Sequence, residues 1–332
     1  MTFDELLPYI FLFLMALSVL IYAVLDGFDL GVGILLHQTD EDFRNQMIAS
    51  IGPFWDANET WLVLAIGILL IAFPEAHNIF LRELYLPVLF LIIGLIVRGI
   101  AFDFRAKAVT KYKRLWDWLF QGGSIMAAAS QGFMMGSYVL GFETGLNALL
   151  FSCLSAIGVT AAYAYIGGAW LVLKTEGELQ KFAARKARIA GWITALGILV
   201  ICLTNPIISP DIAARWFSLP AAILIIPIPM MVVLLLYLSD YYLKSVPVKN
   251  DLGCWIPFAS VAGIFFLCLI GLAYSYYPYV IPNKLLAVDA ASSTASLKFI
   301  FYGVAIVLPI ILIYTFMSYR LFKGKTSELE YY

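Results

Sequence analysis

Long apolar runs, separated by short polar segments, repeat along the whole chain. A helix needs roughly 20 apolar residues to cross a bilayer core of about 30 Å, and about nine runs reach that length. The pattern therefore predicts about nine transmembrane helices, joined by connections too short to hold a soluble domain. The expected spans cover residues 8–36, 55–74, 79–103, 118–140, 146–173, 189–208, 216–242, 254–276 and 298–321.

The composition indicates that most of the surface faces lipid. Hydrophobic residues make up 62% of the 332 positions and charged residues only 13%, whereas a typical soluble domain carries about 25% charged residues. The net charge of −1 and the absence of a long basic run argue against nucleic-acid binding. Cysteines lie in or beside apolar runs without a C-x-x-C pair, so we interpret them as buried apolar residues. They are Cys153, Cys202, Cys254 and Cys268.

Lysine and arginine are divided unequally between the two sides of the predicted bundle. Sixteen lie on the side that holds the C-terminal tail and four on the other, while Arg98 lies within the third span. Cytoplasmic loops carry the excess of positive charge. We therefore expect the N-terminus outside and the C-terminus in the cytoplasm, an arrangement that requires an odd number of spans.

Charged residues within the predicted spans gather near one side of the membrane. Charges in a bilayer are costly, so each is a candidate functional residue. The first and third spans run inward and the second begins in the cytoplasm, so their ionisable groups converge on the cytoplasmic half. These groups are Asp26, Asp29, Asp56, Glu59, Arg98, Asp103 and Arg105. On the outer half, Glu83 is the main isolated charge.

The roles of these carboxylates stay open at this stage. Asp56 and Glu59 lie three residues apart on one helix face, and the helix dipole favours the ionised form of Asp56. They could pass protons inward, or they could form a charge pair at a helix start. Asp26 and Asp29 share a face of the first span and could equally cap or pair at the membrane surface. Arg98 needs a carboxylate partner at its depth, which could be purely structural.

The first span also carries two glycines on a different face. Gly27 and Gly31 have the G-x-x-x-G spacing, and small residues at this spacing let a second membrane helix approach closely. We therefore expect a tight helix contact at this position.

Histidine is scarce, and this limits haem binding. The chain has only His37 and His77, at predicted helix ends on opposite sides of the membrane. A bis-histidine haem needs two ligands at one depth. We therefore expect the chain alone to bind no haem and no metal.

Several of these segments resemble subunit II of cytochrome bd-type quinol oxidases, a family that includes a cyanide-insensitive branch. The most specific are residues 23–33 (AVLDGFDLGVG) and 52–61 (GPFWDANETW). The similarity is densest between residues 20 and 140. Further similar segments are 80–85 (FLRELY), 98–105 (RGIAFDFR), 116–118 (WDW), 131–132 (QG) and 308–315 (LPIILIYT).

The resemblance implies an all-α membrane protein built from two four-helix bundles, residues 1–140 and 146–276, with a peripheral helix at 298–321. It implies a heterodimeric respiratory enzyme of the bacterial cytoplasmic (inner) membrane that oxidises quinol and reduces dioxygen to water. Subunit I of such an enzyme carries the haems b558, b595 and d and the quinol site. Small single-helix accessory subunits are further expected partners, and some members hold a structural quinone in subunit II.

The resemblance also implies a role in proton uptake. The aspartate at the position of Asp56 belongs to a proton route from the cytoplasm into subunit I. Glu59, Asp26 and Asp29 are the groups that we expect to extend this route. Arg98, like Asp103, Arg105 and Glu83, is expected to act in ion pairing.

Two other functions fit the same residues. A proton-coupled secondary transporter would use membrane carboxylates and an arginine, and would show inverted repeats with broken helices. A scaffold subunit would need no proton role at all. Haem absorbance and a large partner subunit in the purified complex distinguish the oxidase from the transporter.

Overall fold

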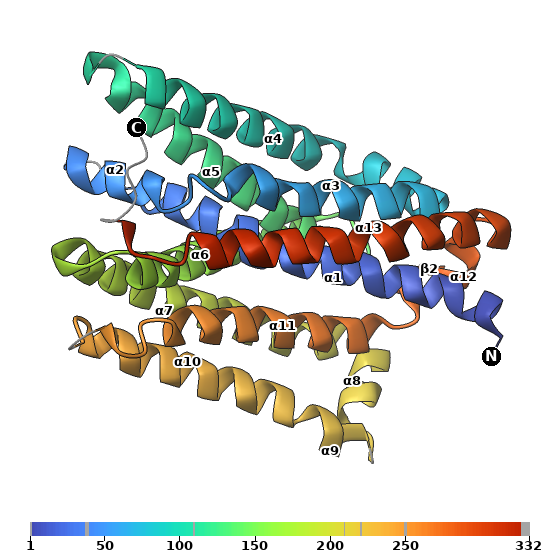
Figure 1. The fold of residues 1–332 in the computed structure, drawn as a ribbon. Coiled ribbons are helices and arrows are strands. Elements are labelled where there is room, and N and C mark those ends of the chain that lie inside the picture. Colours follow the sequence, from blue (N-terminus) through green and yellow to red (C-terminus); the bar gives the residue numbers. More distant parts are fainter. Residues whose placement is uncertain are drawn as a thin grey trace.

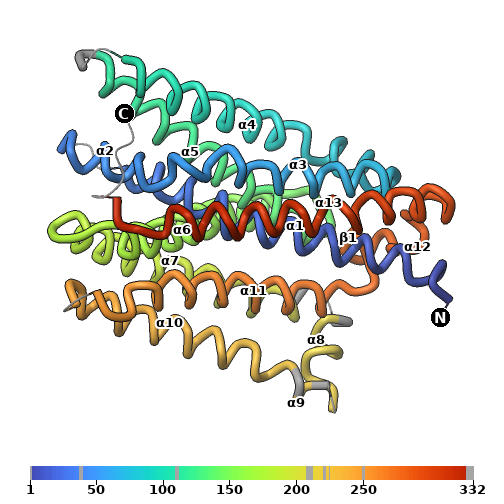
Figure 2. Tube along the Cα trace, viewed as in Figure 1, coloured from blue at the N-terminus to red at the C-terminus, as the bar shows by residue number. Residues whose placement is uncertain are grey.

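The computed structural model describes residues 2–36, 40–108, 110–208, 210–219, 221–248 and 251–326. Long helices lie side by side in one bundle (Figure 1). The start of α1 and the end of α13 lie at opposite ends of this bundle (Figure 2). The helices are α1 (Phe3–Ile34), α2 (Glu41–Ala49), α3 (Trp55–Ala72), α4 (Pro74–Lys107), α5 (Thr110–Val139), α6 (Leu146–Lys174), α7 (Gly177–Ile208), α8 (Pro210–Phe217), α9 (Ala221–Ile225), α10 (Pro227–Ser245), α11 (Ile256–Tyr276), α12 (Ala287–Ala290) and α13 (Thr294–Leu321).

The predicted all-α membrane fold is confirmed. Within the described ranges, seven helices are long and apolar enough to cross a membrane, namely α1, α3, α4, α6, α7, α11 and α13. The other two predicted spans, 118–140 and 216–242, coincide largely with α5 and α10. α5 contains the polar residues Gln121 and Gln131, and α10 has only 19 residues, one of which is Asp240. The count of nine spans therefore stays a prediction.

Helix boundaries differ from the hydrophobic pattern where proline or charged residues intervene. The predicted span 216–242 is divided among α8, α9 and α10, and α10 begins at Pro227. Proline suits a first helical turn, where its missing N–H needs no partner. α4 continues beyond its predicted span but has non-helical dihedral angles at Leu84. Pro87 explains this kink because it cannot donate the backbone hydrogen bond that a straight helix requires at that point.

The longer connections contain small elements of their own. α2 lies between α1 and α3, and the side chain of Asp40 caps it by accepting hydrogen bonds from two backbone N–H groups. Between α11 and α13, β1 (Tyr279–Ile281) pairs antiparallel with β2 (Leu285–Leu286). This small hairpin lies at the end of the bundle where α1 begins (Figure 1).

Helix α1 is the centre of the packing. It contacts α3, α5, α6 and α11, and also α13. Residues 26–33 of α1 are all buried, and there the ring of Phe28 stacks on Trp170 of α6 with centroids 4.1 Å apart. Polar residues in this part of α1 therefore depend on neighbouring helices for their hydrogen-bond partners.

Candidate functional site

The two glycines of α1 lie against α6. A Cβ atom at Gly31 would stand 1.9 Å from the carbonyl oxygen of Tyr163 and 2.8 Å from the Cα of Gly167. A Cβ at Gly27 would stand 2.8 Å from the Tyr163 ring. Only glycine permits the backbone approach at Gly31. The nearby side chains of Asp26 and Asp29 are completely buried.

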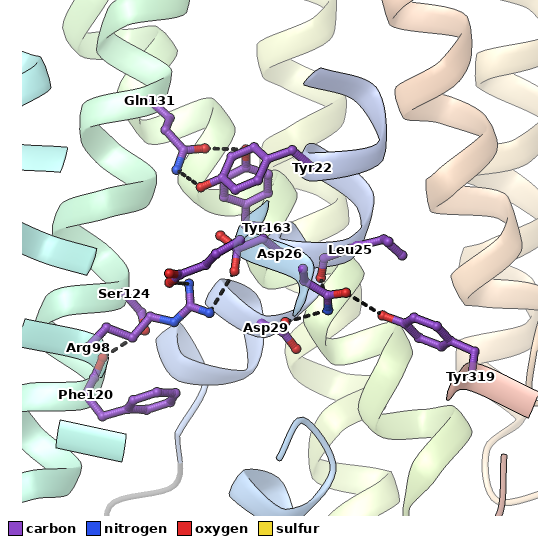
Figure 3. A network of polar contacts seen from close by, with 12 residues as sticks. Tyr22, Leu25, Asp26, Asp29, Arg98, Phe120, Ser124, Gln131, Tyr163 and Tyr319 are labelled. Atoms are coloured by element: carbon purple, nitrogen blue, oxygen red, sulfur yellow. Dashed lines mark hydrogen bonds and ion pairs between the residues drawn. The ribbon is translucent and has the colours of Figure 1, made fainter. Parts of the chain in front are cut away.

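Arg98 of α4 is the buried cation of the site. Its Nη2 donates to Oδ1 of Asp26 at 2.7 Å, and neither side chain is exposed. Its Nη1 lies 3.5 Å from Oε1 of Glu59 on α3, whose side chain remains 27% exposed. Figure 3 shows Arg98 reaching between the helices toward Asp26. Three helices are thus joined by one guanidinium group, and a buried charge of this kind requires such pairing.

Asp29 is held by a different set of groups. Its Oδ2 accepts from Nδ2 of Asn58 at 2.8 Å. The Oδ1 of Asn58 accepts in turn from the hydroxyl of Tyr319 on α13, at 3.0 Å. Figure 3 places Asp29 between the Arg98 pair and Tyr319. Helix α13 therefore takes part in the same polar network as α1, α3 and α4.

A chain of neutral hydrogen bonds continues from Asp26 along α1. Tyr22, one turn earlier on the helix, accepts from Nε2 of Gln131 at 2.7 Å. The hydroxyl of Tyr163 donates to Oε1 of the same glutamine at 2.6 Å. These contacts link α1, α5 and α6 above the ion pair (Figure 3). Donors and acceptors alternate along these hydrogen bonds. They therefore fix the positions of the Tyr22, Gln131 and Tyr163 side chains without adding charge.

Some buried polar atoms of the site have spare hydrogen-bonding capacity. Among the described residues, Oδ1 of Asp29 and Nε of Arg98 have no hydrogen-bond partner. Buried polar atoms of this kind are uncommon and usually mark strain, a catalytic role or bound water. A carboxylate oxygen that is buried and free can accept a proton or a water molecule.

Asp56 is exposed in the first turn of α3. In the described part of the chain it forms no ion pair. Glu59 follows one turn later and is the group that touches Arg98. The four expected carboxylates thus form a sequence from an exposed position to a buried one.

The remaining predicted residues lie elsewhere. Asp103 is exposed near the end of α4. Glu83 pairs with its neighbour Arg82 at 2.9 Å on the surface, where Arg82 is 74% exposed.

Arg105 belongs to a separate buried cluster. Its Nε lies 2.5 Å from Oδ1 of Asp117 on α5, and its Nη2 donates to Asn45 at 2.8 Å. Arg44 of α2 shares the same carboxylate, with its Nε 2.7 Å from Oδ2 of Asp117. Asp117 is fully buried and balances two arginines. This cluster joins α2 and α4 to α5, and within the described ranges no ion pair links it to the Arg98 network.

Sequence reasoning missed Asn58, Tyr319 and the pairing role of Asp117. Asn58 could have been found, since it lies on α3 between the two predicted carboxylates. Tyr319 could not, because no pattern in a lone terminal helix indicates which helix it contacts.

Metal-ligating groups are scarce in the described ranges. Those ranges contain no cluster of three histidine, cysteine or acidic residues that could hold a metal ion. His77 lies in the first turn of α4, and His37 lies outside the described residues.

Comparison with known proteins decides the family. A family model described as cytochrome bd terminal oxidase subunit II matches residues 7–322. The chain belongs to this family. It is therefore a subunit of a quinol oxidase complex of the bacterial inner membrane, with several membrane-spanning helices, haems in the complex and a subunit I as partner. The alternative of a secondary transporter is not favoured.

Individual relatives agree with this assignment over most of their length. The cytochrome bd ubiquinol oxidase subunit 2 of Bacillus subtilis is 26% identical, over 92% of this chain and 93% of the relative. The cytochrome bd-I ubiquinol oxidase subunit 2 of Escherichia coli K12 is also 26% identical, over 98% and 96%. A chain of the bd oxidase structure from Geobacillus thermodenitrificans has the same fold, with a TM-score of 0.78 at 17% identity, covering 95% of this chain and 98% of that one.

Proposed function

We propose that this subunit admits protons from the cytoplasm and passes them toward the haem-bearing subunit I, where quinol is oxidised and dioxygen is reduced to water. The names of the curated relatives, which include ubiquinol oxidase, support a quinol as substrate. The haems b558, b595 and d belong to subunit I in this proposal.

The observation that carries the proposal is the ordered burial of the carboxylates. Asp56 is exposed, Glu59 is partly exposed, and Asp26 and Asp29 are fully buried. Arg98 touches both Glu59 and Asp26, so it holds the inner groups at short range. Carboxylates linked by water accept and release protons with little movement, and perturbed groups of this kind cluster at functional sites.

The proposal also covers the orientation of the chain in the membrane and its division into two helix bundles. The end of the bundle with Asp56 carries the greater number of lysines and arginines, which supports a cytoplasmic position. Contacts between neighbouring helices join α1, α3, α4 and α5 into one group and α6, α7, α10 and α11 into another, and α6 also packs against α1 and α5. This supports two four-helix bundles, with α13 as the peripheral helix.

Replacement of Asp56 by asparagine tests the proton role. Asp56→Asn keeps the shape of the side chain but cannot carry the proton. The complex should assemble with its full haem absorbance, while oxygen consumption falls and proton uptake from the cytoplasmic face slows. Asp42→Asn is a matched control, because Asp42 is an exposed aspartate in the first turn of α2.

The readouts separate this proposal from a scaffold role. Oxygen consumption and proton uptake in proteoliposomes should change in Asp56→Asn and stay at the wild-type level in Asp42→Asn. Wild-type turnover and uptake in an Asp56→Asn complex would show that the residue only stabilises the start of α3.

A further inference from the structure

A basic pocket lies between α7 and α10, away from the Arg98 network. It has a volume of about 340 Å³. Its lining includes four basic side chains and one acidic one: Lys181, Arg185, Arg188, Lys244 and Glu178. The proposed proton route uses none of these residues.

The charges around this pocket do not balance. Glu178 pairs with Lys181 at 2.7 Å. Asp240, one turn before Lys244 on α10, pairs with Arg188 at 2.9 Å and with Lys244 at 2.6 Å. Two carboxylates therefore face four cations, and two positive charges are left over. Arg185 takes part in no ion pair with any residue that the structure describes, so it is available to an anion.

The pocket lies at the depth of the lipid headgroups. The candidate span of α7, Gly177–Pro206, has 30 residues, which corresponds to about 45 Å of helix. The hydrocarbon core is about 30 Å thick, so about ten residues of α7 extend beyond it. The basic positions fall in the first turns of α7 and the last turn of α10, which lie side by side at the same end of the bundle (Figure 1).

An exposed apolar surface continues from the pocket toward the membrane interior. On α7, Ile189, Trp192 and Leu196 follow Arg185 at helical spacing and are 59%, 66% and 61% exposed. On α10, Tyr241 and Tyr237 precede Lys244 by one and two turns, and their rings stack. Such a surface accepts acyl chains, and tryptophan and tyrosine are typical of the membrane interface.

We propose that the pocket between α7 and α10 binds the phosphate of an anionic phospholipid, with the acyl chains along the exposed faces of α7 and α10. Basic pockets between transmembrane helices recognise such headgroups. Phosphate chemistry alone fits both a lipid and free phosphate, and the adjoining apolar surface is the reason to assign a lipid.

The test is lipid binding to the purified complex of both subunits. After delipidation, phosphatidylglycerol is added back and the bound lipid is counted by native mass spectrometry. One surface lysine or arginine contributes about 1 kcal/mol to anionic lipid binding, a factor of about five. We expect Arg185→Gln to weaken retention about fivefold and the double variant Arg185→Gln/Lys181→Gln about thirty-fold.

Lys186→Gln is the matched control. Lys186 is the exposed neighbour of Arg185, and its replacement removes the same charge, but it does not line the pocket. Haem absorbance and yield verify that each variant assembles. Equal retention in the Arg185 and Lys186 variants would overturn the proposal.

Two further measurements identify the ligand. Phosphatidylcholine has the same phosphate with a compensating positive charge, and we expect it to be retained far less than phosphatidylglycerol. Equal retention of the two lipids would refute recognition of an anionic headgroup. Inorganic phosphate should displace phosphatidylglycerol only weakly; efficient displacement would show a site for free phosphate instead.

Discussion

Arg98→Met should destabilise the protein strongly, because it leaves Asp26 as a buried charge without its cation. At an effective dielectric constant of about 20, two unit charges 2.7 Å apart attract each other by about 6 kcal/mol before the cost of desolvation. Removal of one partner from a buried ion pair typically costs about 3–5 kcal/mol. We expect a loss in this range.

A second substitution should recover much of that loss. In Arg98→Met/Asp26→Leu both charges are gone, and apolar replacement of a buried pair is often neutral or stabilising. Glu59 remains, but its side chain is 27% exposed and can reach water. The double variant should therefore be more stable than Arg98→Met, and the two substitutions should be strongly non-additive.

The assay is unfolding of the purified complex by sodium dodecyl sulfate in mixed micelles, followed by tryptophan fluorescence and haem absorbance. Arg82→Met is the control, because Arg82 pairs with Glu83 at the surface and an exposed pair contributes about 0–1 kcal/mol. If Arg98→Met and Arg82→Met cost the same, or if the double variant is no more stable than Arg98→Met, the assignment of a tightly coupled buried pair is wrong.

Two further substitutions test the packing and the link to the last helix. Gly31→Ala should prevent the close approach of α1 and α6 and greatly lower the yield of complex, whereas Gly67→Ala, with no atom within 4 Å of its added Cβ, should be tolerated; similar yields would contradict the close contact. Tyr319→Phe removes the donor to Asn58 and should lower the free energy of unfolding by about 0.5–1.5 kcal/mol. Tyr302→Phe, at a 65% exposed position of the same helix, should change it little, and equal effects would show that the hydrogen bond does not contribute.

Much of the architecture could be predicted because a bilayer imposes simple rules. Length and apolarity identify a spanning helix whatever it packs against. The same rules, applied to the amino-acid sequence, place Asp26, Glu59 and Arg98 at one end of the bundle. What they could not supply was the choice of partner, since Asp26, Asp29, Asp56, Asp103 and Glu59 are alike in sequence terms. The direction of each side chain and the angles at which the helices cross decide which carboxylate pairs with Arg98.

The seven charges expected on one half of the membrane do not form a single network among the described residues, for the same reason. Arg105 turns to Asp117 of α5, while Asp103, two residues earlier, is exposed. At 100° per residue, positions two apart point away from each other. Helix periodicity alone could therefore have separated these two, but only the tertiary structure shows that α5 supplies the carboxylate.

The contact between Asn58 and Tyr319 has a consequence for biogenesis. Residue 58 emerges from the ribosome long before residue 319, so the amide of Asn58 lacks this partner during most of translation and insertion. Asn58 is buried in the finished protein, and a polar group left unsatisfied in a membrane is costly. Insertion of α13 therefore completes the network, and a chain truncated before it would expose a polar defect that membrane proteases and chaperones can recognise.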